Sequence, residues 1–161
     1  MSANGLSPDG HVPTTYNWNF TVQHKLPGAI AVDVGYVGSS SNHLPFTERL
    51  NDAGFGAAWL PQYQDPTKTA KFDGTTTLPI DLTRPYTGVG QASVINWGGS
   101  SNYHALQMSA NSRAKKGLEF GVSYTWSHAL GAFSDRGNTT YPGQGRDTYY
   151  GPLSFDRRHT L

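Results

Sequence analysis

Apolar and polar residues alternate one by one along four segments of this chain, which is the pattern of a β-strand with two unlike faces. The clearest segment is residues 118–128, whose apolar members are Leu118, Phe120, Val122, Tyr124 and Trp126. The other three segments are residues 15–26, 29–38 and 102–113. The pattern predicts an all-β fold, and it leaves open what covers each face of the sheet.

The connections between these segments alternate between short and long. Leu26-Pro27-Gly28 is a tight-turn signal between the first two segments, and Gly117 allows a turn between the last two. Residues 39–101 and 129–153 are long and rich in turn-forming residues. In an antiparallel up-and-down sheet this order places all tight turns at one end and all long loops at the other.

One more strand-like run, Ala92–Trp97, lies inside the first long connection. Counting it as a wall strand would break the alternation of short and long connections. We therefore interpret it as the first arm of a hairpin above the sheet, which turns at Gly98-Gly99-Ser100.

Composition restricts the class of protein. Hydrophobic residues make up 36% and charged residues 14% of the chain, and the charged share is low for a soluble domain. The net charge of +1 gives no electrostatic basis for binding nucleic acid. The absence of cysteine excludes disulfides and thiolate metal sites. No apolar run approaches the roughly 18 residues of a transmembrane helix, and an export signal, if one exists, would lie upstream.

Two architectures fit alternating strands: a soluble β-sandwich with a protein core, and a membrane β-barrel whose apolar face meets lipid. Three features favour the barrel. The polar face carries few charges, the strands are long compared with the five or six residues common in sandwiches, and short turns and long loops lie at opposite ends. His24 on the apolar face is contrary evidence, but it lies near the short-turn rim.

Large aromatic residues support the barrel. They lie roughly seven to nine residues from the short-turn end, a height close to the ~25 Å apolar band of such barrels. Trp and Tyr prefer the boundary between lipid and water because the ring is apolar and its polar atom stays hydrated. We expect these residues to form a membrane-interface girdle: Trp18, Tyr36, Tyr124 and Trp126.

The sequence also resembles a known family. The pieces that carry the resemblance are W-N-x-x-V-Q-x-x-L-P, Y-V-G-S, S-N-Y-H-A-L-Q, F-x-V-S-Y-T-W-S and F-D-x-R-H, found in this order across most of the chain. Together they resemble the barrel region of TonB-dependent receptor-like outer-membrane proteins, and more narrowly the Oar-like group. Each piece alone is weak evidence, whereas the set is fairly specific.

The resemblance implies a barrel of about 22 strands with a plug domain in its lumen, located in the bacterial outer membrane and energised through TonB. This chain would supply four wall strands and the start of another at 154–161, so we expect a fragment that cannot transport by itself. The expected partners are outer-membrane lipid, an unknown solute, and a plug domain and TonB system supplied by the missing part.

No catalytic constellation is recognisable in the sequence. It lacks the G-x-S-x-G, H-E-x-x-H and Walker A motifs, and its six histidines are scattered along strands and loops rather than spaced as metal ligands. We expect a protein that is not an enzyme and that has no cofactor and no metal site.

Charged residues on the polar face and aromatic residues in the loops are the candidates for binding a substrate. A packing or solvated role is the competing interpretation for all of them, and for the aromatics the alternative is that the loops pack on one another. The candidates on the polar face are Asp33, Arg113 and Glu119, and those in the loops are Trp59, Tyr63, Tyr149 and Tyr150.

Three functions remain open from the sequence. The first is a transmembrane β-barrel of antiparallel strands with long extracellular loops, which binds or takes up a bulky extracellular solute. The second is a secreted or surface β-sandwich that binds carbohydrate. The third is an adhesive surface barrel that transports nothing.

Overall fold

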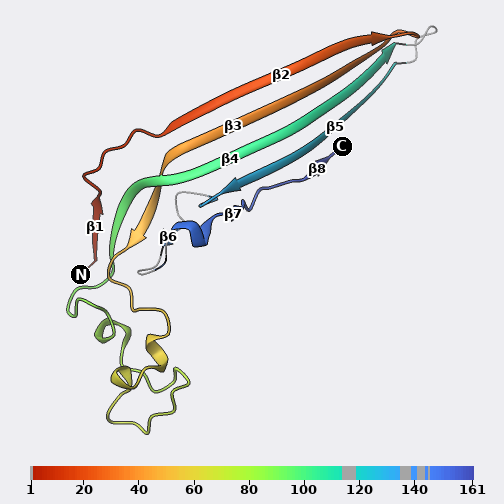
Figure 1. Ribbon diagram of the computed structural model, residues 1–161. Coiled ribbons are helices and arrows are strands. Elements are labelled where there is room, and N and C mark those ends of the chain that lie inside the picture. The colour runs from red at the N-terminus through yellow and green to blue at the C-terminus, as the bar shows by residue number, and fades with distance from the viewer. Residues whose placement is uncertain (1, 114–118, 135–138, 141–143, 145) are drawn as a thin grey trace. The chain divides into compact units, whose positions relative to one another are not determined.

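The computed structural model describes residues 2–113, 119–134, 139–140, 144 and 146–161. Four long strands lie side by side in chain order in Figure 1: β2 (Thr14–Leu26), β3 (Ile30–Arg49), β4 (Ala92–Arg113) and β5 (Glu119–Gly131). Four short strands complete the sheet: β1 (Ala3–Leu6), β6 (Thr139–Thr140), β7 (Gly151–Pro152) and β8 (His159–Thr160). The predicted all-β class with antiparallel β2–β3 and β4–β5 pairs is confirmed.

Within the described residues, the remaining regular structure consists of single turns of 3-10 helix: η1 (Ala57–Trp59), η2 (Pro61–Tyr63), η3 (Ile80–Leu82) and η4 (Arg146–Tyr149). No helix in the described part of the chain is long and apolar enough to cross a membrane.

The chain divides into two compact units, and β3 and β4 contribute residues to both. Unit 1 comprises Met1–Gly10, Pro45–Trp97 and Asp135–Gly145. Unit 2 comprises His11–Leu44, Gly98–Ser134 and Arg146–Leu161. Unit 2 therefore holds β2, β5 and the adjoining parts of β3 and β4, whereas unit 1 holds the long connection between β3 and β4.

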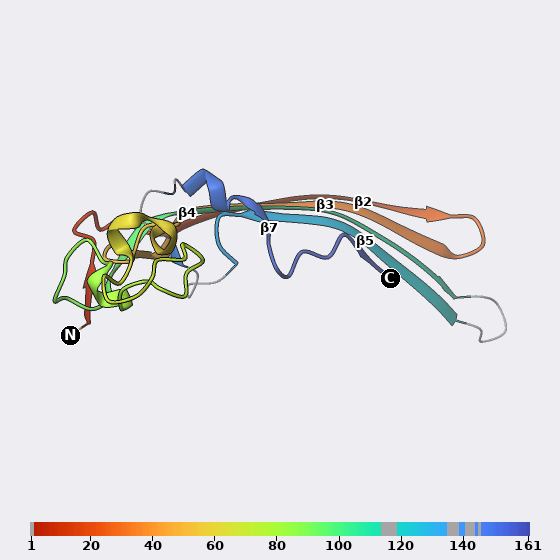
Figure 2. The ribbon, with the colours of Figure 1, turned by 90° about the horizontal axis from the view of Figure 1, so that it is seen from below.

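The turn between β2 and β3 follows the sequence prediction. Leu26 is paired with Ile30, so three residues make the turn. Gly28 and Ala29 have φ values of 91° and 60°, which require the left-handed conformation that Gly adopts without strain. Figure 2 shows this turn beyond the ends of β2 and β3. The predicted turn at Gly117 lies outside the described residues.

Residues at even positions of the long strands in unit 2 share one face, here called the apolar face, and residues at odd positions share the polar face. Directly paired residues show this arrangement, for example Val22 with Val34 and Ala110 with Val122. The apolar face is solvent-accessible in this chain: Phe20 is 70% and Val122 is 55% exposed. Apolar side chains that project from a sheet without a covering layer need another environment to bury them.

The sheet is open and single-layered in the described residues. β2 pairs only with β3, and no second sheet faces it. Buried hydrophobic side chains are few and mostly small: Phe46, Ala57, Ala105, Ala129, Ala132 and Leu153. A β-sandwich would bury the apolar faces of two sheets against each other, and the described part of this chain does not.

Two strands are longer than the sequence indicated. β3 continues past residue 38 to Arg49, and β4 begins at Ala92 rather than at residue 102. The expected loop 39–101 is therefore confined to residues 50–91. Within the expected C-terminal strand 154–161, only His159–Thr160 is paired as a strand.

The hairpin expected at Gly98-Gly99-Ser100 is wrong, because these residues lie inside β4. Gly99 does not form a turn; it allows the backbone of β3 to come close to β4. A Cβ atom at position 99 would lie 3.0 Å from the Leu44 carbonyl oxygen and 3.2 Å from the Leu44 Cβ on β3. Glycine inside a strand commonly marks such a place, where another backbone comes near.

Candidate functional site

The four girdle candidates all lie on the apolar face of unit 2. Trp18 and Trp126 are 41% and 47% exposed, and Tyr36 is 39% exposed. Register places Trp18 opposite Gly38, and Trp126 opposite Leu106. Trp18, Tyr36, Tyr124 and Trp126 form what we call the aromatic band. Phe20 and Val22 continue the apolar face from this band toward the β2–β3 turn.

Two histidines that the sequence did not single out contact the tyrosines of the aromatic band. The Tyr36 hydroxyl lies 2.7 Å from His104 Nδ1, and the Tyr124 hydroxyl lies 2.7 Å from His159 Nδ1. The Trp18 ring also contacts His104, with 6.2 Å between ring centroids. The sequence offers one signal for His104, its even position in β4. It does not indicate the contact with Tyr36, since Tyr36 lies 68 residues earlier in the chain.

The polar face carries the predicted strand candidates. Ser109 Oγ donates a hydrogen bond of 3.0 Å to Asp33 Oδ2, so these residues of β3 and β4 lie together. Arg113 is paired with Glu119 across β4 and β5, and Arg113 Nε lies 3.0 Å from Glu119 Oε1. Both side chains of this ion pair are largely exposed, so the pair contributes little to stability.

A hollow of about 670 Å³ lies on unit 2 near the β2–β3 turn. Lys25, Asn111, Arg113 and Glu119 contribute polar groups to its lining, and Leu26 and Ile30 contribute apolar ones. The structure thus brings Arg113 and Glu119 together in one concavity, while Asp33 is bonded to Ser109 farther along the strands.

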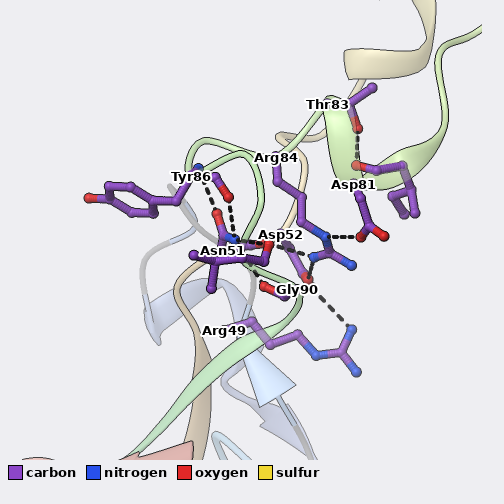
Figure 3. A network of polar contacts seen from close by, with 10 residues as sticks. Arg49, Asn51, Asp52, Asp81, Thr83, Arg84, Tyr86 and Gly90 are labelled. Carbon is purple, nitrogen blue, oxygen red and sulfur yellow. Dashed lines mark hydrogen bonds and ion pairs between the residues drawn. The ribbon is translucent and has the colours of Figure 1, made fainter. Parts of the chain in front are cut away.

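Unit 1 is organised around Asn51, which is fully buried. Its side-chain nitrogen donates to the carbonyl oxygens of Tyr86, Val89 and Gly90 at 3.1, 3.0 and 2.9 Å, and its side-chain oxygen accepts the Tyr86 N–H at 2.8 Å. Figure 3 shows these bonds converging on one amide. Asn51 therefore fastens the beginning of the β3–β4 connection to its end.

Arg84 adds a second fastening at the same place. Its Nη1 donates to the Asn51 carbonyl oxygen at 2.6 Å and to Asp52 at 3.0 Å, and its Nε donates to Asp81 at 2.9 Å (Figure 3). The Asp81 carboxylate, followed by that of Asp52, raises the pKa of the Arg84 guanidinium. Arg49 also lies 3.2 Å from Asp52, which is thus shared between two cations.

Two short Asp-x-Thr turns shape the middle of the connection. Asp65 accepts hydrogen bonds from the N–H and hydroxyl of Thr67, and Asp73 accepts the same pair from Thr75. These bonds stabilise the charged carboxylate, so the Thr67 and Thr75 hydroxyls hold the pKa of each aspartate below its usual value. Such turns satisfy loop backbone without a strand partner.

The connection presents apolar side chains on its surface despite this internal order. Phe55 is 94%, Trp59 55%, Ile80 63% and Tyr86 67% exposed. A cavity of about 260 Å³ lies beside Trp59 and Ile80, and small residues such as Gly54 and Ala57 form part of its lining. Of the predicted loop residues, Trp59 lines this cavity, whereas Tyr63 is half-buried in η2.

The C-terminal loop candidates lie in unit 2 and are held by contacts there. The Tyr149 ring packs on Phe133 at 5.8 Å between centroids, and the Tyr150 hydroxyl accepts a 2.9 Å hydrogen bond from Asn102. These two tyrosines are in a different unit from Trp59 and Tyr63. The structure therefore divides the predicted loop aromatics into two groups.

Asp156 anchors the segment before β8. Its carboxylate accepts the Ala129 N–H at 2.7 Å and the Arg158 Nε–H at 2.8 Å. The Ala129 hydrogen bond, supported by Arg158, holds the pKa of Asp156 below its usual value. Asp156 and Arg158 come from the F-D-x-R-H motif, so this motif forms a wall contact that joins β5 to the following segment.

Among the described residues, no cluster of three or more His, Asp or Glu side chains is arranged to hold a metal ion. The arrangement instead offers an exposed apolar face with an aromatic band, a hydrogen-bonded polar face, and an ordered connection with exposed aromatics.

Comparison with protein families gives one result that covers the whole chain. A family model described as "Outer membrane beta barrel domain" matches residues 1–161. The searches of curated proteins and of solved structures find no match.

Proposed function

The chain belongs to the outer membrane beta barrel domain family and lies in the bacterial outer membrane, and we propose that it serves there in the binding and uptake of a bulky extracellular solute. In this proposal it forms wall and extracellular loops of a TonB-dependent receptor-like barrel of the Oar-like group. A plug domain and the TonB system would complete the transporter.

The two faces of the sheet support a wall role. The apolar face carries Phe20, Val22 and Val122 exposed, as a lipid-facing wall requires. The polar face carries hydroxyl, amide and carboxylate groups, among them the Asp33–Ser109 hydrogen bond. A barrel interior that receives a polar partner or solute needs groups of this kind.

The observation that carries the solute-binding proposal is the ordered β3–β4 connection with its exposed aromatics. Asn51 and Arg84 fix the two ends of the connection through buried hydrogen bonds, yet Trp59 remains 55% exposed beside a cavity. Aromatic rings held on a fixed scaffold offer a stacking surface for sugar rings and for apolar groups of peptides. Loops carried on a rigid scaffold are common binding elements.

Uptake of two labelled probes, a dextran oligosaccharide and a peptide of similar mass, tests the proposal in cells that produce the protein. We expect saturable accumulation of one probe, and loss of accumulation when the proton-motive force is dissipated. Trp59→Ala should weaken binding of that probe by about tenfold, a usual cost of removing a contact aromatic. Phe72→Ala is the matched control, because Phe72 is exposed but does not line the cavity.

The adhesive barrel is the second candidate, and the same exposed aromatics favour it. It predicts binding of a probe at the cell surface with no accumulation under any energetic condition. Absence of saturable binding for both probes would contradict the two candidates together.

A further inference from the structure

The aromatic band contains the same side-chain pair twice. Tyr36 on β3 contacts His104 on β4, and Tyr124 on β5 contacts His159 on β8, each with 2.7 Å between the hydroxyl oxygen and Nδ1. The rings are nearly parallel in both pairs, with interplanar angles of 17° and 28°. A repeated geometry on four strands points to a shared role.

The hydrogen bond determines what each histidine presents outward. We assign the tyrosine hydroxyl as the donor and Nδ1 as the acceptor, because a phenol hydroxyl is a good donor and an unprotonated imidazole nitrogen is a good acceptor. The neutral ring then carries its hydrogen on Nε2. His104 and His159 are both exposed, and neither Nε2 has a hydrogen-bond partner among the described residues. Each pair therefore offers a free, oriented N–H donor.

The surroundings of these donors favour an anionic acceptor. In the described residues of unit 2, the even positions of β2, β3, β4 and β5 contain no Asp or Glu. No carboxylate at these positions can therefore accept a hydrogen bond from the histidine Nε2–H groups. Arg158, the residue before His159, lies 2.7 Å from His128 through its guanidinium and is paired with Asp156.

The height of the pairs identifies the source of the anion. Trp18 contacts His104, and Trp126 is paired with His159. Trp and Tyr on a lipid-facing surface lie at the level of the lipid head groups. The acceptors found at that level in a bacterial outer membrane are phosphate oxygens, which take charge-assisted hydrogen bonds from imidazole.

We propose that the Tyr36–His104 and Tyr124–His159 pairs bind the phosphate group of a membrane lipid. The histidine Nε2–H groups donate to the phosphate oxygens, and the tyrosine hydroxyls hold the imidazole rings in the donating orientation. The lipid's acyl chains lie along Phe20 and Val22 below the band. This role requires the outer-membrane location alone and is independent of solute uptake.

Native mass spectrometry of the purified protein in maltoside micelles tests the proposal. The two added lipids are phosphatidylglycerol and a galactolipid with the same acyl chains. We expect the protein to retain phosphatidylglycerol in preference to the galactolipid. The double variant His104→Leu/His159→Leu should lower that preference at least about tenfold, the effect of losing a charge-assisted hydrogen bond.

Two further variants keep the test decisive. Tyr36→Phe/Tyr124→Phe retains ring volume and both histidines, so it should fold and lower the preference through loss of ring orientation. His43→Leu is the matched control, because His43 stacks on His11 in unit 2 and is not part of the aromatic band; it should leave the preference unchanged.

Three results would overturn the proposal. The first is equal retention of the two lipids by the unaltered protein. The second is an unchanged preference in the histidine and tyrosine double variants. The third is full displacement of phosphatidylglycerol by inorganic phosphate at equal concentration, which would identify free phosphate, instead of a lipid, as the ligand.

Discussion

The Trp18 indole on β2 lies across Gly38 on β3, in the space that a side chain at position 38 would occupy. Trp18 reaches past this glycine to contact His104 on β4. Gly38 is therefore the residue that lets one aromatic side chain of the band span three strands. The same device occurs on the polar face, where Thr21 lies over Gly35 and Asn111 over Gly121.

Substitution of Gly38 by Ala should displace the Trp18 ring. The added methyl group overlaps the indole, and forcing extra volume into a filled position costs about 1–3 kcal/mol. We expect a lower free energy of unfolding in urea. In a background in which the other three tryptophans are replaced by phenylalanine, we also expect a shift of the Trp18 emission to longer wavelength. The fluorescence change is the more specific of the two readouts.

Gly151→Ala provides the matched control for this variant. A Cβ atom at position 151 meets nothing within 4 Å, so stability and emission should be unchanged. Equal effects of the two substitutions would contradict the role assigned to Gly38.

Asn51→Asp should loosen the β3–β4 connection while preserving side-chain volume. The carboxylate has no N–H to offer, so three carbonyl oxygens that now accept from Asn51 would lose their donor. Each buried group left unsatisfied costs about 1–3 kcal/mol. We expect proteolytic cleavage within residues 50–91 to become faster, with little change in the strands of unit 2.

Asn42→Asp is the control for the Asn51 variant, because it makes the same chemical change at an exposed position of β3. A rate of cleavage as high in this control as in Asn51→Asp would show that the buried amide does not hold the connection.

Acid should destabilise the same connection through Asp65 and Asp73. Thr67 and Thr75 lower the pKa of these carboxyls in the folded state, whereas an unfolded chain gives Asp a pKa of about 3.9. Their contribution is therefore complete above the unfolded value and is lost as the pH falls through the lower folded-state pKa. The protection factors for hydrogen exchange of residues 63–78, which correct for the slower intrinsic exchange in acid, should fall in that acidic range.

The double variant Asp65→Asn/Asp73→Asn removes the titrating groups. It should show lower protection factors at neutral pH and a weaker dependence of these factors on pH between neutral and acid. An unaltered acid dependence in this variant would assign the effect to other carboxyls.

Asp156→Asn should release the segment before β8 from β5. One amide oxygen replaces two carboxylate acceptors, and the amide NH2 would face either the Ala129 N–H or the Arg158 guanidinium. The Ser127 N–H, which now bonds the Arg158 carbonyl oxygen, should then lose protection from hydrogen exchange. Asp9→Asn, at an exposed position outside the strands, should leave that protection intact.

Period-two alternation located the strands wherever the two faces differ. β2, β5, the first half of β3 and the second half of β4 follow the predicted positions because many of their even residues are large and apolar. The extension of β3 was missed because Ser39-Ser40-Ser41-Asn42 shows no contrast between faces. The start of β4 was missed because Gly98-Gly99 indicates a turn locally, whereas its function is close approach to Leu44.

The site was less accessible to sequence reasoning. Alternation placed Trp18 and Tyr36 on one face, but their shared contact with His104 depends on the pairing of β3 with β4, which local sequence does not specify. Asn51 lies in a stretch rich in turn residues, where Asn is ordinary. Only the fold brings Tyr86, Val89 and Gly90 around its amide.

Spin labelling in lipid bilayers tests the central claim, that the apolar face meets lipid and the polar face does not. The chain contains no cysteine, so single cysteines can be placed at Phe20 and Val122 on the apolar face and at Thr21 and Ser123 on the polar face. Labels at positions 20 and 122 should be accessible to oxygen dissolved in lipid and protected from a water-soluble nickel complex. Labels at 21 and 123 should show lower access to oxygen. Equal access at neighbouring positions, or the reverse order, would contradict the account.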